Sequence, residues 1–160
     1  MTDPIAVRSA TADDQPGITQ LIRDAHLNPR DLDWRRFVVA DAGGRLVGCA
    51  QVRVHRLGTR EVASVAVSAK HQGSGIGRRL VEAILAHERD TIYLMTERHT
   101  EGYFERFGFK RMPAAAAPPD FRRQYRIGVI ATTVLSLVAR RRLRIVPMRR
   151  AAPPPTPPPT

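Results

Sequence analysis

The chain has 160 residues, a formal net charge of +11, 42% hydrophobic residues and 26% charged residues. These values are typical of a folded globular protein and exclude a chain that is disordered throughout. The longest apolar run, residues 127–139, is too short to span a bilayer, and the first residues lack the pattern of a secretory signal. Cys49 is the only cysteine, so neither an internal disulfide nor a Cys-based metal site is expected. We therefore expect a cytoplasmic protein.

The first 67 residues predict a meander of antiparallel strands interrupted by one helix. Thr11 suits a helix N-cap, apolar residues recur at helical spacing from Ile18 to Ala25, and Asn28 and Pro29 are expected to stop the helix. The strand-like segments are residues 5–8, 37–40, 46–55 and 61–67.

After residue 67 the apolar spacing alternates between helical and strand-like periods. Helices are expected at residues 75–87, 100–107 and 120–139, and strands at residues 91–96, 109–112 and 143–148. This order predicts an α/β (α+β) fold with a mixed, mostly antiparallel central sheet that contains a strand–helix–strand crossover.

We expect residues 1–150 to form a single domain, and residues 151–160, which include six prolines, to form a disordered tail. Positive charge is concentrated late in the chain: residues 120–150 hold nine arginines and one acid, whereas residues 1–119 carry a net charge of only +3. The preferred interpretation is a solvated basic surface without a specific nucleic-acid partner, because no aromatic residues interleave with the block Arg140-Arg141-Arg142-Leu143-Arg144 as a base-stacking platform requires. Docking on nucleic acid or an anionic membrane is the alternative.

Three glycines at every second position, Gly73, Gly75 and Gly77, lie between a predicted strand and a predicted helix. Such a bend lets consecutive amide groups converge on an anion at a helix N-terminus, which favours a phosphate or diphosphate. The spacing fails the dinucleotide fingerprint, and Gly77 is followed by arginine rather than the lysine of a nucleoside-triphosphate loop. A glycine-rich helix start without a ligand is the alternative.

Two further segments stand in a fixed order around this loop. The pattern Gln72-x-x-Gly75-x-Gly77 resembles the acetyl-CoA diphosphate loop of the GNAT superfamily of N-acetyltransferases. Residues 61–67 resemble the strand before that loop, and residues 103–109, Tyr-Phe-Glu-Arg-Phe-Gly-Phe, resemble the family's second signature. The resemblance runs from about residue 5 to residue 112 and resumes at the closing strand, while residues 113–142 match no motif and read as a helical, arginine-rich insertion.

The resemblance implies a GNAT-like acyltransferase fold that binds acetyl-CoA as co-substrate and needs no metal. The coenzyme's pantetheine arm would pair with the strand backbone at Val65 and Val67, and its diphosphate would lie on the amides of residues 72–77. The implied coenzyme-binding residues are Val65, Ala66, Val67, Gln72, Gly73, Ser74, Gly75, Ile76, Gly77, Arg78 and Phe104.

The implied chemistry is direct attack of a neutral amine on the thioester. Glu61 is the candidate base, acting directly or through water, and its alternative role is an ion pair with a neighbouring residue such as Arg53. The family's usual proton-donating tyrosine stands where this chain has Phe104. Tyr103 is the candidate donor, although a one-residue offset rotates it by about 100° around a helix. A packed aromatic role is its alternative.

These observations predict an N-acetyltransferase that acetylates a primary amine of a small molecule or amino acid. The alternatives are a non-catalytic acyl-CoA-binding module and a protein or peptide N-acetyltransferase. The oligomeric state stays open, with a homodimer as one option. Four polar residues near strand ends are candidate acceptor contacts or ordinary loop residues, the latter being preferred: His55, Thr96, Glu97 and His99.

Overall fold

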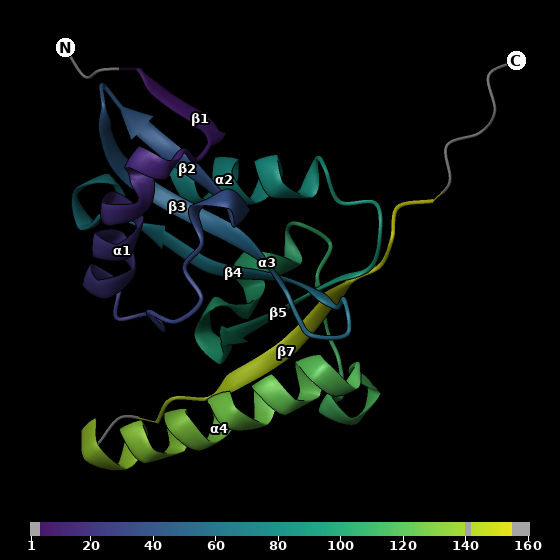
Figure 1. The fold of residues 1–160 in the computed structure, drawn as a ribbon. Helices are drawn as coiled ribbons and strands as arrows, with labels where there is room; N and C mark the ends of the chain where they lie inside the picture. The colour runs from purple at the N-terminus through teal and green to yellow at the C-terminus, as the bar shows by residue number, and fades with distance from the viewer. Residues whose placement is uncertain (1–3, 140–141, 155–160) are drawn as a thin grey trace, which may run out of the picture. The chain divides into compact units, whose positions relative to one another are not determined.

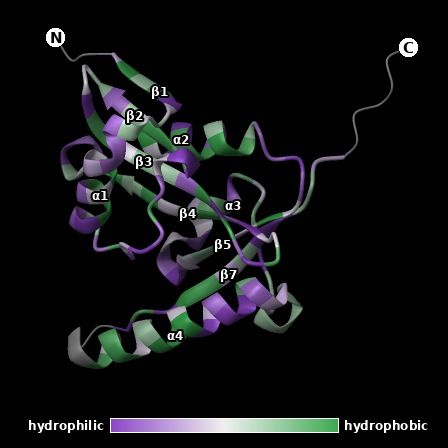
Figure 2. Cartoon of the chain, viewed as in Figure 1, coloured by the Kyte–Doolittle hydropathy of each residue, from purple (hydrophilic) through white to green (hydrophobic). Residues whose placement is uncertain are grey.

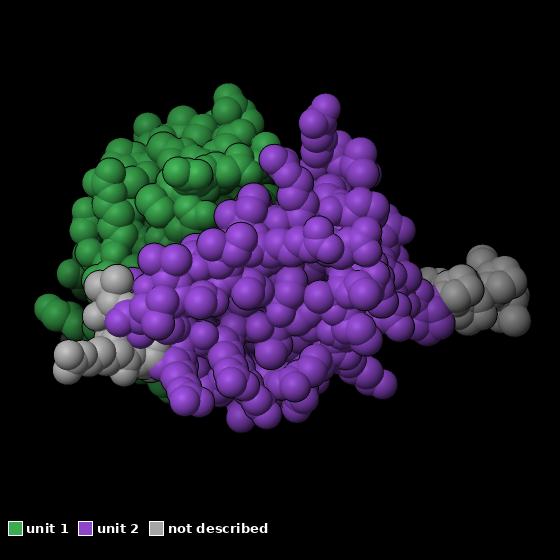
Figure 3. Space-filling model, turned by 90° about the horizontal axis from the view of Figure 1, so that it is seen from below, with its two compact units in different colours: residues 1–53, 62–87 green, residues 54–61, 88–160 purple. Residues whose placement is uncertain are grey.

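A computed structural model describes residues 4–139 and 142–154 (Figure 1). The chain divides into two compact units: unit 1 comprises residues 1–53 and 62–87, and unit 2 comprises residues 54–61 and 88–160 (Figure 3). The element bounds lie close to those expected from the sequence, and each unit is described by itself.

Unit 1 combines four strands with two helices. Its strands, in sheet order, are β1 Ile5–Ser9, β2 Phe37–Ala42, β3 Arg45–Val54 and β4 Arg60–Val67, of which the last residue of β3 and the first two of β4 fall in unit 2. The pairs β1–β2 and β2–β3 are antiparallel, as predicted. The helical segments are η1 Ala12–Asp14, α1 Gln15–Asp24, η2 Trp34–Arg36, η3 Ala69–His71 and α2 Ile76–Leu85.

The core of unit 1 forms where the apolar faces of the helices meet the sheet. From α1, Ile18, Leu21 and Ile22 are buried in one cluster with residues of β2, β3 and β4. Helix α2 packs so closely that a Cβ atom on Gly48 would stand 3.0 Å from Ile76 Cγ2 and 3.1 Å from Leu80 Cδ1. A side chain at position 48 would therefore push α2, and the loop before it, away from the sheet.

Helix α1 ends at Asp24, four residues before the stop predicted from Asn28. His26 adopts a left-handed backbone conformation with φ of 53°, and the Leu27 amide donates to the Ile22 carbonyl. This hydrogen-bonding pattern closes a helix without proline, so the backbone rather than the Asn-Pro pair terminates α1.

Unit 2 contains three strands and two helices. The strands are β5 Ile92–Glu97, β6 Lys110–Arg111 and β7 Ile145–Arg150; β7 lies between the other two and is antiparallel to both. The helical segments are η4 Arg98–Thr100, α3 Glu101–Glu105, η5 Ala114–Ala116 and α4 Pro119–Ala139. Helix α4 runs alongside β7 in Figure 1, and its fully buried Phe121 packs with Met112, Tyr93 and Tyr125.

The α/β class and the antiparallel pairing follow the sequence predictions, and α2 connects β4 to β5 as the expected crossover helix. The helix expected in the insertion is confirmed and begins at Pro119. Residues 151–154 have no regular secondary structure, while the rest of the predicted tail, residues 155–160, lies outside the described residues. The single-domain interpretation stays a prediction.

Candidate active site

The glycine-rich loop of unit 1 has the backbone geometry of an anion cradle. Gly73 and Gly75 have φ angles of 78° and 81°, and Gly75 is the N-cap of α2. A Cβ atom at either position would meet no atom within 4 Å, so the space above the loop is open. The first hydrogen bond of the helix joins the Arg79 amide to the Gly75 carbonyl, so the amides of Ile76 and Gly77 precede the helical ladder. These features fit a diphosphate.

Short polar contacts hold this loop in shape. Ser68 Oγ lies 2.8 Å from His71 Nδ1, Gln72 Nε2 donates to the Val67 carbonyl at 3.2 Å, and Ser74 Oγ donates to the His71 carbonyl. His71 and Gln72 thus order the loop through their side chains. The loop's shape is therefore built into the protein before any ligand arrives.

The arginines after the loop have partners within unit 1. Arg78 Nε donates to Glu82 Oε1 at 2.7 Å, and Arg79 Nη2 donates to the Ile5 carbonyl at 2.9 Å. Arg79 therefore contacts the backbone of β1.

Strand β4 contains a feature that sequence reasoning missed. Ser64 has a φ angle of 55°, a left-handed conformation that is rare for a residue other than glycine. Gln51 Nε2 donates to Ser64 Oγ at 2.8 Å and supports this conformation from β3. A left-handed residue interrupts the period-two alternation of the strand directly before Val65. No residue type marks the position, since serine has no preference for this conformation.

In unit 2, Glu61 and His55 form a buried pair. His55 Nε2 lies 2.7 Å from Glu61 Oε2, and the two side chains are 8% and 3% exposed. The His55 ring also contacts Phe121 edge-on, with ring centroids 5.9 Å apart. The sequence treated His55 as an ordinary polar residue. The signal that was available is the short turn at residues 57–59, which brings residues six apart in sequence together across a hairpin.

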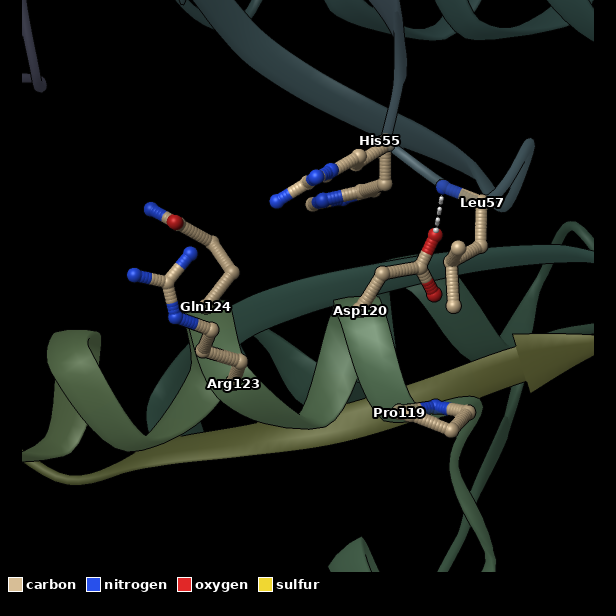
Figure 4. A pocket seen from close by; sticks show the side chains of 7 residues that line it. His55, Leu57, Pro119, Asp120, Arg123 and Gln124 are labelled. Carbon is tan, nitrogen blue, oxygen red and sulfur yellow. Dashed lines mark hydrogen bonds between the residues drawn. The ribbon is translucent and has the colours of Figure 1, made fainter.

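The imidazole of this pair opens onto a pocket of about 500 Å³ within unit 2 (Figure 4). Figure 4 shows Arg123 and Gln124 rising from α4 opposite the His55 ring, with the Asp120 carboxylate turned toward the Leu57 amide. The pocket is lined by His55, Arg56, Leu57, Pro119, Asp120, Arg123 and Gln124.

The only carboxylate of this pocket is occupied by internal hydrogen bonds. Asp120 accepts from Thr59 Oγ1 at 2.6 Å and from the amides of Leu57 and Phe121, each at 2.9 Å. Burial alone would raise the pKa of Asp120, but these donors outweigh burial and lower it. Within the described residues, the side chains of Arg56 and Arg123 form no hydrogen bond or ion pair, so the pocket carries uncommitted positive charge.

The second predicted signature forms an aromatic cluster in unit 2. Tyr103 and Phe104 both lie on α3, with ring centroids 5.1 Å apart and an interplanar angle of 86°. Tyr103 also packs edge-on against Phe107, and Phe104 against Phe109. The packed aromatic role considered for Tyr103 therefore has a structural basis, and its role as proton donor stays a prediction.

The remaining candidate contacts have local partners. Thr96 Oγ1 lies 2.6 Å from Thr100 Oγ1, and Glu97 pairs with the exposed His99. Within residues 4–139 and 142–154, no three His, Cys, Asp or Glu side chains form a group that suits a metal ion. Over the same residues, no helix is both long enough and apolar enough to cross a bilayer.

The fold, the glycine loop ahead of α2 and the aromatic α3 together define a class of coenzyme A-dependent acyltransferases. The acetyltransferase (GNAT) domain family matches residues 33–111 of this chain, a segment that contains the loop, the Glu61–His55 pair and α3. The chain belongs to the GNAT superfamily, as the sequence motifs predicted.

Individual relatives agree with this membership. An amino-acid acetyltransferase of Ralstonia nicotianae is 33% identical over 138 residues, which cover 78% of this chain and 30% of that protein. Rv2747 from Mycobacterium tuberculosis, solved in complex with CoA and NLQ, has a TM-score of 0.69 at 28% identity and covers 92% of this chain and 99% of its own. The N-acetylglutamate synthase from Neisseria gonorrhoeae, complexed with coenzyme A and N-acetyl-glutamate, has a TM-score of 0.73 at 22% identity, over 96% of this chain and 36% of that chain.

The last of these likenesses confirms the GNAT fold and nothing further. The chain spans about a third of the length of the Ralstonia and Neisseria relatives.

Proposed function

We propose that this protein is an acetyl-CoA-dependent N-acetyltransferase that acetylates the primary amine of a small molecule or amino acid. The observation that carries the proposal is the loop at Gly73 and Gly75, whose two left-handed glycines leave open space at the start of α2. GNAT membership and the CoA-bound relative of similar length support it.

The chain's residues fit the coenzyme. The amides from Gly73 to Gly77 would hold the diphosphate, and the β4 backbone at Val65 and Val67 would pair with the pantetheine arm. When bound, the coenzyme supplies the activated acetyl group. The loop needs no metal to offset the diphosphate charge, because helix α2 presents its positive end there.

The amine must lose a proton before it attacks, since an amine with a pKa near 10.4 is only about one part in a thousand neutral near pH 7.4. We propose that His55 accepts this proton as the general base. Glu61 is the positioning residue, which holds the imidazole through the 2.7 Å contact. This assignment refines the sequence prediction, in which Glu61 acted directly or through water. The reason is position: His55 is among the residues that line the pocket, and Glu61 is not.

The pocket beside His55 favours an acceptor that also carries a carboxylate. Arg56 and Arg123 offer planar guanidinium groups there, and Gln124 adds an amide donor. An amino acid combines the required amine and carboxylate. Its amine would approach His55, and its carboxylate would lie on the arginines.

The departing thiolate needs less help than the amine. Phe104 has no hydroxyl group, so Tyr103 is the remaining candidate donor on α3. A coenzyme A thiol is acidic enough to leave without a donor, so we expect Tyr103→Phe to reduce turnover less than His55→Ala does.

The decisive experiment measures coenzyme binding and thiol release on one preparation. Acetyl-CoA should raise the melting temperature, and free thiol should appear with some members of a panel of amines, amino acids and peptides. Arg123→Ala should raise the KM for the best amino acid and leave acetyl-CoA affinity unchanged, while decarboxylated analogues should not respond to the substitution.

Two results would contradict the proposal in different ways. Stabilisation by acetyl-CoA without thiol release from any acceptor would indicate the acyl-CoA-binding module instead. If acetyl-CoA does not change the melting temperature, the glycine loop does not bind the coenzyme and the proposed diphosphate site is wrong. Cytoplasmic location and homodimer formation stay predictions that this experiment does not address.

A further inference from the structure

Helix α4 is apolar on the side that faces away from its own unit. Four large apolar side chains on this side are about half exposed or more: Ile127 49%, Ile130 65%, Val134 56% and Leu137 77%. In the hydropathy view, hydrophobic green is frequent in the C-terminal half of α4, whereas hydrophilic purple is concentrated in its N-terminal half (Figure 2). A surface helix ordinarily places polar residues on this side.

The geometry of α4 shows that these residues are not misplaced core residues. Gly128 faces β7 so closely that an added Cβ atom would stand 2.9 Å from Ile145 Cδ1. At about 100° per residue, Ile130 and Leu137 lie roughly 200° and 180° around the helix from Gly128. The packed side of α4 is already filled by Phe121 and Tyr125. The exposed apolar face is therefore a second surface with no partner in the described residues of unit 2.

Positive charge borders this face at both ends. Arg122 and Arg126 precede it on α4, and the exposed Arg142 and Arg144 follow the helix. The one acid of the helix, Asp120, is occupied by the 57–59 turn. The face thus offers apolar side chains between two groups of guanidinium groups.

This charge pattern selects the occupant. If a second copy packed α4 against α4, either helix direction would bring arginine groups together, and like charges at an interface are unfavourable. A bilayer with anionic headgroups suits both features, because the apolar side chains enter the headgroup boundary while the arginines contact phosphates.

We propose that α4 docks this protein on anionic lipid surfaces, with residues 127–137 in the interface and the flanking arginines on the headgroups. The contact is peripheral, since the stripe covers about 15 Å of helix, half the thickness of a bilayer core. It is independent of the proposed acetyl transfer, which uses the loop, the Glu61–His55 pair and the pocket arginines Arg56 and Arg123.

The test is cosedimentation of the full chain with vesicles at low salt. Vesicles that contain phosphatidylglycerol should bind the protein, and pure phosphatidylcholine vesicles should bind it much more weakly. Raising the salt should release most of the protein, because a contact at the membrane surface is screened. Leu137→Glu should lower the partition coefficient about tenfold or more.

Two matched controls separate the apolar and basic contributions. Leu57→Glu makes the same change at another exposed leucine, 70% exposed and off the α4 face, and should bind vesicles as the unmodified chain does. Arg142→Glu with Arg144→Glu should reduce binding by about tenfold or more, whereas Arg23→Glu with Arg45→Glu should have little effect. All these positions are exposed, so folding should survive each change.

Three outcomes would overturn the proposal. The first is no association with anionic vesicles at low salt. The second is equal binding by the Leu137→Glu and Leu57→Glu variants, which would show that the apolar face is not used. The third is a dimer in sedimentation equilibrium that Leu137→Glu abolishes, together with no vesicle binding, which would assign the face to a second copy.

Discussion

The glycine loop of unit 1 and the Glu61–His55 pair of unit 2 present different chemical groups of the chain. The loop presents main-chain amides, and its shape depends on two glycines with positive φ angles. The pair presents side chains that are buried and joined by one short contact of 2.7 Å. A loop of amides binds a charged group without discriminating its remainder, whereas a positioned side-chain pair can move a proton.

This difference predicts that substitutions in the two regions change different measured properties. Changes in the loop should weaken coenzyme binding, and changes in the pair should slow turnover while coenzyme still binds. The following predictions test that separation, from the largest expected effect to the smallest.

Removing the imidazole should have the largest effect. We expect His55→Ala to lower turnover by about 10²- to 10⁴-fold, because the acceptor amine then loses its proton acceptor. Added imidazole should restore part of the activity, which a purely structural role would not allow. His99→Ala, at an exposed histidine paired with Glu97, is the control and should keep its turnover. If both variants lose turnover equally, the His55 imidazole has no special role in the reaction.

The core residue that packs against His55 should contribute mainly to the stability of the protein. Phe121 is fully buried and contacts the His55 ring, so Phe121→Ala should lower the free energy of unfolding by about 3–5 kcal/mol. Chemical denaturation measures this loss. Leu57→Ala, at an exposed leucine, should cost less than about 0.5 kcal/mol. A small effect at Phe121 would mean that unit 2 does not depend on this core.

A single methyl group should distinguish the loop from an ordinary helix start. Gly75→Ala forces a left-handed conformation on alanine, which costs about 1–2 kcal/mol, so both stability and acetyl-CoA affinity should fall. Gly102→Ala is the matched control, since its added Cβ also meets no atom within 4 Å but its φ is not positive. Unchanged acetyl-CoA affinity in isothermal titration of Gly75→Ala would refute the cradle.

The smallest expected effect concerns acid stability in unit 1. The Arg8 guanidinium donates to Asp14 at 2.7 Å and lowers the pKa of this carboxyl group to about 2. A lowered pKa contributes stability above the unfolded value near 3.9, and that contribution is lost as pH falls toward 2. Between pH 5 and 2, Asp14→Asn should therefore lose less melting temperature than the unmodified chain. Asp13→Asn, at an exposed neighbour, should follow the unmodified chain.

Much of the fold was predictable because local patterns agree with the tertiary structure. The helix expected at residues 75–87 is α2 at Ile76–Leu85, and the helix expected in the unmatched insertion is α4. Strand periods and glycine positions are properties of short windows, which tertiary contacts adjust by only a few residues. The early end of α1 shows the limit, because the left-handed conformation of His26 has no sequence marker.

The candidate site was predictable only where it consists of backbone. The spacing of Gly73, Gly75 and Gly77 predicted a tight bend, and the first two of these glycines have the positive φ angles that other residues adopt at a cost. The contact between Glu61 and His55 was not predicted, although the short turn at residues 57–59 brings the two residues together across a hairpin. The uncommitted arginines of the pocket, Arg56 and Arg123, are 67 residues apart in the sequence, so no local window contains both.

From its residue order alone, this protein acquires its element sequence, its left-handed glycines and its basic final quarter, because each depends on neighbours within one or two helical turns. Only the tertiary structure decides that Glu61 meets His55, that Ser64 turns left-handed, and that the apolar residues of α4 face outward. Those outcomes depend on which faces find packing partners, and packing partners come from distant parts of the chain.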